Sequence, residues 1–98
     1  MRGRTCYVVS YDIMDPKRLQ RVHRTMKGFG DAVHYSVFRC DLTPKGRVEM
    51  IAALTGLIKH DEDRVMIIDL GPAEGMAEER IQFLGAHSAK VRENAIIV

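Results

Sequence analysis

The chain has 98 residues, and 46% of them are hydrophobic, which is enough for one modest core but not for two. No apolar run approaches the roughly 20 residues that a membrane span needs, and the first residues lack the apolar stretch of a signal peptide. We therefore expect a single domain over residues 1–98 that is cytoplasmic and has no membrane partner. The net charge is only +2, yet residues 1–49 hold ten Lys and Arg against five Asp and Glu, while residues 50–98 hold five against eight. This asymmetry favours an anionic partner for the N-terminal half.

Residues 4–13 are predicted to form the first strand. Tyr7 and Val9 alternate with Cys6 and Val8, so both faces are apolar and the strand is expected to be central in its sheet. The strand ends at Asp12, which is either a polar strand end or a carboxylate held rigidly at the rim of the sheet within reach of a metal and a substrate.

The cysteines do not suggest a disulfide or a zinc site. Cys6 and Cys40 lie in strand-like segments, and the sequence has no Cys-x-x-Cys motif or Cys/His cluster. Both are expected to be buried free thiols.

A basic helix is predicted to follow, from Pro16 to about Phe29, with Asp15 as its N-cap and glycines 28 and 30 ending it. One stripe of the helix faces the core: Leu19, Val22, His23, Met26 and Phe29. The rest of its surface carries five basic residues with no acidic residue among them: Lys17, Arg18, Arg21, Arg24 and Lys27. Such a face is either solvated or binds phosphates, and the lack of compensating acids favours phosphate binding without base reading.

Further strand-like segments and a second helix follow the basic helix. Residues 32–42 are strand-like, either as one kinked strand or as a tight pair that turns near Ser36. A second helix begins after Thr43 with Pro44 at its first position, and residues 48, 51, 52, 54, 57 and 58 form its predicted core stripe. Residues 60–63 are a polar loop, residues 64–70 an apolar strand ended by Gly71, and residues 80–84 a short strand-compatible segment. The apolar end, residues 94–98, is predicted to be an edge strand or to extend a partner's sheet.

Two helices interleaved with at least four strands indicate an α+β fold. We predict a ferredoxin-like sandwich, an antiparallel sheet with both helices on one face. The fold alone names no function.

Several motifs together resemble a known family. They are Val-Val-Ser-Tyr-Asp-Ile at the end of the first strand, Asp-Pro before a basic helix, Gly-Phe-Gly, and His-Tyr-Ser-Val-Phe-Arg-Cys-Asp-Leu. In this order and spacing, over about residues 6–70, they are similar to the small CRISPR-associated endoribonuclease/endonuclease family. Its members are the smaller partner of the integrase in the spacer-acquisition complex.

The resemblance implies a ferredoxin-like homodimer in which Asp12 of each protomer lies at the interface and shares a divalent metal, Mg²⁺ or alternatively Mn²⁺. The apolar C-terminal strand is also expected at the dimer interface. The resemblance implies hydrolysis of single-stranded RNA, duplex DNA or both, and it makes Tyr11, Ser36 and Phe38 further catalytic candidates beside Asp12. It also matches Arg18 and Arg21 to functional arginines of helix one. The chain departs from the family pattern at one place. Some members carry an arginine just before the Tyr-Ser-Val-Phe motif, whereas this chain has Asp-Ala-Val-His there, ending in His34.

Three hypotheses follow. The chain is a metal-dependent phosphodiesterase, a non-catalytic dimeric scaffold that holds duplex DNA in the integrase complex, or an unrelated ferredoxin-like binding module. An RNA-recognition motif is disfavoured because its Lys/Arg-Gly-Phe-x-Phe pattern is missing, and an acylphosphatase because no glycine-rich loop precedes the first helix. Toxin-type ribonucleases are the nearest rival enzymes.

Overall fold

The computed structural model describes residues 3–75, 77–85 and 96–97. Its main elements follow the order β-α-β-β-α-β, and three short elements follow them. In chain order these are β1 (Thr5–Asp12), α1 (Pro16–Met26), β2 (Asp31–His34), β3 (Val37–Leu42), α2 (Pro44–Leu57), β4 (Arg64–Pro72), a 3₁₀ helix (Glu78–Arg80), β5 (Gln82–Phe83) and β6 (Ile96–Ile97).

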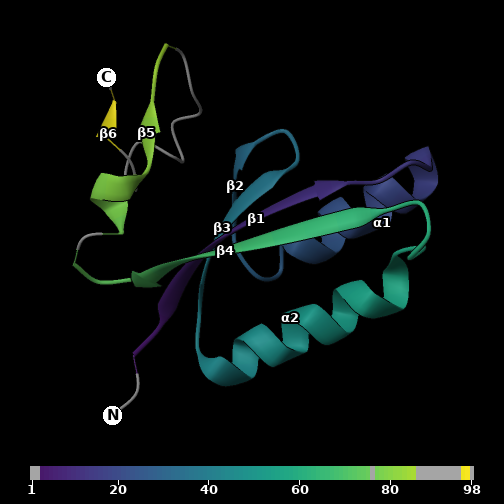
Figure 1. Ribbon diagram of the computed structural model, residues 1–98, viewed down its shortest axis with the longest axis horizontal. Helices are drawn as coiled ribbons and strands as arrows, with labels where there is room; N and C mark the ends of the chain where they lie inside the picture. The colour runs from purple at the N-terminus through teal and green to yellow at the C-terminus, as the bar shows by residue number, and fades with distance from the viewer. Residues whose placement is uncertain (1–2, 76, 86–95, 98) are drawn as a thin grey trace.

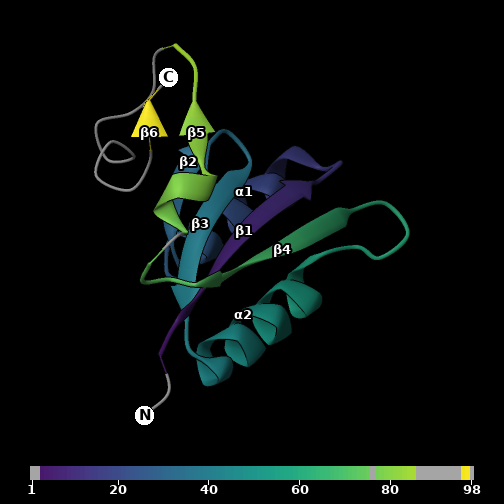
Figure 2. The same cartoon turned by 60° about the vertical axis from the view of Figure 1, so that its left-hand side comes forward.

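The sheet has the order β2-β3-β1-β4, and each neighbouring pair of strands is antiparallel. Both helices lie on one side of this sheet, while β5 and β6 lie at the opposite end of the molecule from α2 (Figures 1 and 2). This arrangement is the predicted ferredoxin-like α+β sandwich, with β1 as the predicted central strand. The segment before Leu42 forms a tight hairpin, with Tyr35 and Ser36 as the turn between β2 and β3.

The core lies between the sheet and the helices. It is built from the helix-facing residues of β1 and β3 together with residues of α1 and α2: Tyr7, Val9, Tyr11, Ile13, Val22, Met26, Phe38, Cys40, Leu42, Met50 and Leu54. Both predicted N-caps are confirmed, because the Asp15 side chain accepts a hydrogen bond from the Arg18 backbone N–H (2.9 Å) and Thr43 Oγ1 accepts one from Gly46 N–H (3.1 Å). Both cysteines are buried free thiols, as predicted.

Three predicted boundaries or faces were wrong. Helix α1 ends at Met26 rather than Phe29, and Gly30 then packs so closely on β3 that a Cβ atom there would lie 2.2 Å from the Arg39 carbonyl oxygen. On α2, Met50 is fully buried while Val48 is exposed, because two residues along a helix lie about 200° apart around its axis. Strand β4 continues to Pro72, which is tolerated because β4 is an edge strand of the sheet.

The C-terminal region contains a second, two-stranded sheet in which β5 and β6 pair in parallel. The predicted strand over residues 80–84 is shorter than expected, because residues 78–80 form the 3₁₀ helix. Residues 94, 95 and 98 of the predicted last strand lie outside the described residues. Within the described ranges, no helix is long and apolar enough to cross a bilayer.

Candidate nuclease and nucleic-acid-binding site

Asp12 is the last residue of β1, the strand that pairs with β3 on one side and β4 on the other. Its neighbour Tyr11 faces the helices, so the alternation of the strand directs Asp12 to the sheet face that the helices leave open. Asp12 is exposed, and its carboxylate has no hydrogen bond or ion pair with any described residue. A rigid strand therefore presents a carboxylate whose oxygens are available to other ligands.

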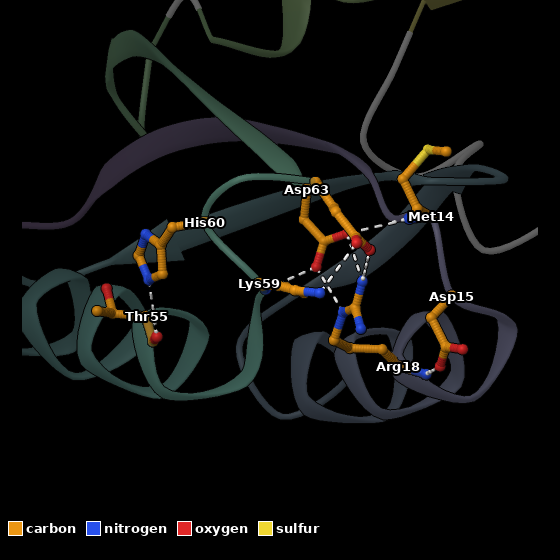
Figure 3. A network of polar contacts seen from close by, with 8 residues as sticks. Met14, Asp15, Arg18, Thr55, Lys59, His60 and Asp63 are labelled. Carbon is orange, nitrogen blue, oxygen red and sulfur yellow. Dashed lines mark hydrogen bonds and ion pairs between the residues drawn. The ribbon is translucent and has the colours of Figure 1, made fainter.

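The loop after Asp12 is fixed by a buried carboxylate, Asp63, which lies just before β4 (Figure 3). Its Oδ1 accepts from the Met14 backbone N–H (3.0 Å), and its Oδ2 accepts from the Lys59 backbone N–H (2.7 Å). The Arg18 guanidinium donates to both oxygens, from Nε at 2.6 Å and from a terminal nitrogen at 3.0 Å. Asp63 thus joins the β1–α1 loop, α1 and the α2–β4 loop.

This ion pair changes the protonation chemistry of both groups. Hydrogen bonds from Arg18 hold the pKa of the Asp63 carboxyl well below its usual range, although burial opposes the shift. The same contact raises the pKa of the Arg18 guanidinium. Glu62 adds a second, more exposed bond to Arg18 at 3.2 Å, and its own pKa is lowered chiefly by Lys59. The pair is therefore charged throughout the physiological range.

The remaining residues implied by the family resemblance gather around Tyr11. Its backbone N–H donates to the Ser36 carbonyl oxygen (3.0 Å), and its hydroxyl lies 2.8 Å from His23 Nδ1. Phe38 stacks on the Tyr11 ring with centroids 6.2 Å apart and meets the His23 ring edge-on at 5.3 Å. Burial raises the pKa of the Tyr11 phenol.

Phe38 was expected to take a direct part in catalysis, but its side chain is 0% exposed. Its role is therefore packing. Ser36 and Tyr11 are different, since both line a groove beside α1. The structure therefore brings Tyr11, Asp12, Ser36 and Phe38 to one end of β1, but on both faces of the strand.

The basic face of α1 is smaller than predicted. Arg18 is only 17% exposed and is held by Asp63, so it is a compensated residue, and the prediction of five uncompensated cations is wrong at this position. The compensating acid is 45 residues away in sequence. The other four cations are exposed and form no ion pair within the described part of the chain: Lys17, Arg21, Arg24 and Lys27.

Few side chains in the described structure are placed to bind a metal ion together. Among the described residues, no group of three or more His, Cys, Asp or Glu side chains could hold a metal ion. Asp12 fits as a ligand even without such a group, because its carboxylate is exposed and has no partner in these residues. Mg²⁺ commonly takes only one or two carboxylates, with waters and phosphate oxygens as its other ligands. Among the described residues, a single chain offers one carboxylate at this rim.

Sequence reasoning missed two features of this region. Asp63 was assigned to a polar loop, because nothing in the local pattern marks an acid whose partner lies in another helix. His23 was assigned to the core stripe of α1, and a titratable residue on a core stripe is a signal that could have indicated a buried partner such as Tyr11. His34, at the family's arginine position, packs edge-on against Phe83 of β5.

The fold and this geometry define a class, a ferredoxin-like domain that presents an aspartate at the rim of its sheet. The family model for CRISPR associated protein Cas2 matches residues 5–75. The chain belongs to the Cas2 family.

Relatives of known sequence and structure agree with this assignment. The chain is 42% identical over 92 residues to the Rhodospirillum rubrum protein named CRISPR-associated endoribonuclease Cas2 1, covering 94% of this chain and 89% of that one. It is 39% identical to the Geobacter sulfurreducens CRISPR-associated endoribonuclease Cas2, covering 94% and 96% of the two chains. The crystal structure of Streptococcus pyogenes Cas2 matches with a TM-score of 0.72 at 30% identity, over 82% of this chain and 99% of that one. A hypothetical protein from Thermus thermophilus matches with a TM-score of 0.74 at 27% identity, over 88% and 96%.

Proposed function

We propose that this protein is a metal-dependent endonuclease of CRISPR spacer acquisition that hydrolyses phosphodiester bonds in single-stranded RNA, duplex DNA or both. The observation that carries the proposal is Asp12, an exposed carboxylate without a partner among the described residues, at the end of a strand paired on both sides. The names of the two relatives, both CRISPR-associated endoribonuclease, support the same activity.

The metal and the homodimer form one proposal. Asp12 and its copy in a second protomer are the residues that would hold Mg²⁺ or Mn²⁺. When bound, such an ion polarises a scissile phosphate and lowers the pKa of a coordinated water. The open face of the sheet supports a second copy as its cover, because Met66 and Ile68 of β4 are 51% and 40% exposed there, beside Val8 of β1.

Nucleic-acid binding is proposed for α1. Its four exposed cations favour the phosphate backbone, and a duplex contact should then weaken with salt by a log-log slope of about −0.9 per phosphate. The larger CRISPR-associated integrase is the proposed protein partner of the dimer.

The second candidate function is a non-catalytic dimeric scaffold that holds duplex DNA within the integrase complex. It is favoured by the same basic helix and by the lack of a three-ligand metal cluster in the described residues of one chain. The two candidates differ only in whether Asp12 acts on a bound phosphate.

The test is Asp12→Asn, with the exposed loop carboxylate Asp61→Asn as a matched control. Cleavage of single-stranded RNA and duplex DNA with Mg²⁺ or Mn²⁺, nucleic-acid affinity, and melting temperature are measured on each preparation, and sedimentation gives the mass. The nuclease proposal expects Asp12→Asn alone to abolish cleavage, with affinity and melting temperature retained and a mass of two chains. A lower melting temperature with normal cleavage per folded molecule would give Asp12 a structural role, and duplex binding by a wild type that never cleaves would establish the scaffold.

A further inference from the structure

A groove of about 370 Å³ lies between α1 and the β2–β3 turn. It is on the helix side of the sheet, whereas Asp12 belongs to the open side, so it is separate from the proposed metal ligand. Its size is within the range of small-ligand pockets. Neither its shape nor its chemistry was foreseen from the sequence.

The floor of the groove is formed by Leu19 and by the rings of Tyr11 and His23. The hydroxyl of Tyr11 and Nδ1 of His23 satisfy each other at 2.8 Å, and Phe38 packs on both rings from the core. These two polar atoms are therefore paired within the protein. The floor combines two aromatic rings with the aliphatic side chain of Leu19.

The rim has a different character. Arg24 of α1 and Lys27, the C-cap residue of that helix, line the groove, and neither has an anionic partner in the described ranges. Tyr35, at the tip of the hairpin, also lines it and is 95% exposed. An aromatic ring this exposed, next to two cations, has the two chemistries that single-stranded nucleic acids use, stacking for a base and positive charge for its phosphate.

We propose that this groove binds one unpaired nucleotide of a nucleic-acid strand, with its base stacked on Tyr35 over the apolar floor and its phosphate held by Arg24 and Lys27. The nucleotide must be unpaired, because a base within a duplex is already stacked on both faces. This inference rests on the proposed nucleic-acid function. It adds base stacking by Tyr35 to a helix that the sequence predicted to bind phosphates only.

The experiment compares wild type, Tyr35→Ala and Tyr35→Phe by fluorescence anisotropy with three labelled probes: oligothymidine, oligouridine and a blunt DNA duplex. Because base–aromatic stacking is worth about 5-fold to 150-fold in affinity, Tyr35→Ala should weaken single-strand binding at least about fivefold. Tyr35→Phe should bind as wild type, since it retains the ring. Duplex affinity and the salt slope should not change in either variant, because no phosphate contact is lost.

Arg21→Ala is the matched control, since Arg21 is an exposed cation of the same helix that does not line the groove. It should weaken duplex and single-strand binding together and make the salt dependence shallower. Melting temperatures of all variants should match, because Tyr35 and Arg21 are both exposed.

The outcomes separate the two proposals. If the wild type binds none of the probes, both the proposed nucleic-acid binding and the proposed nucleotide site are refuted. Binding of all probes with no selective loss in Tyr35→Ala overturns the groove alone. A selective loss with oligouridine but not oligothymidine, or the reverse, supports the groove and shows which of these two single strands it accepts.

Discussion

Replacing Phe38 by Leu separates packing from catalysis at the end of β1. The side chain is fully buried and contacts the rings of Tyr11 and His23 at centroid distances of 6.2 and 5.3 Å. Each ring contact is worth about 0.5–1.5 kcal/mol beyond the area that it buries. The substitution keeps a hydrophobic side chain but removes both contacts, so we expect a loss of about 2 kcal/mol.

For a domain of this size, that loss should lower the melting temperature by about 8–16 °C. The matched control is Met50→Leu, which is also fully buried but lies on α2 and replaces no aromatic ring. A volume-conserving swap of this kind should cost less than about 1.5 kcal/mol. Calorimetry or circular dichroism on both variants measures the difference between them.

Function per folded molecule should not change in Phe38→Leu, because no atom of Phe38 reaches the surface. Tyr11 keeps its backbone bond to Ser36, and Asp12 remains at the end of a paired strand. Cleavage and nucleic-acid affinity are measured well below the melting transition of the variant. A variant that melts like wild type but has lost cleavage or affinity would refute the packing assignment and restore a direct role for Phe38.

Two further predictions concern ionisation. Because folding lowers the pKa of Asp63, its ion pair with Arg18 stabilises the native state above the unfolded carboxyl pKa of about 3.9, and this stabilisation is lost as the pH falls further. Asp63→Asn should therefore lower the melting temperature at pH 7 and flatten its decline below about pH 4; an unchanged acid profile would contradict the pair's role. Burial raises the pKa of Cys6 to about 11 and that of Cys40 to about 12. A thiol reagent at about pH 8 should therefore label neither residue until the protein unfolds, as mass spectrometry of native and denatured samples would show.

Local signals predicted the elements well. Asp15 and Thr43 each precede a proline, and each caps a helix as the pattern indicated, because capping depends on residues three positions away. The alternation in β1 separated Tyr7 and Val9 from Cys6 and Val8, but it left both faces apolar, and only the structure shows that the first face packs on the helices. The buried face of α2 was harder, since Val48 and Met50 are both apolar and only the packing of the helix decides which one is covered.

Features that depend on distant pairs could not be predicted. Arg18 looked like one of five equivalent cations, but it is bound to Asp63 from a loop 45 residues away. Tyr35 lies in a segment predicted as one kinked strand or as a tight pair that turns near Ser36, and the hairpin turn places it beside α1 at the edge of the groove. In both cases the sequence contains the residue types, but the tertiary fold creates the neighbours that determine what they do.

The basic residues at the two ends of α1 have different roles, because their neighbours differ. Its first turn holds Arg18, which binds Asp63 and so fixes the loop that leaves Asp12, whereas Arg24 and Lys27 near its end have no such partner in the described chain. Tyr11 and Asp12 are consecutive residues of one strand, so the groove and the carboxylate lie on opposite faces of the sheet. A nucleic-acid strand held in the groove would have to cross from one face of the sheet to the other to reach Asp12, and Met14 and the loop that Asp63 anchors lie at the end of β1 where Asp12 is. Loosening that loop should therefore disturb cleavage before it disturbs binding in the groove, because the groove residues are fixed by α1 and the hairpin instead.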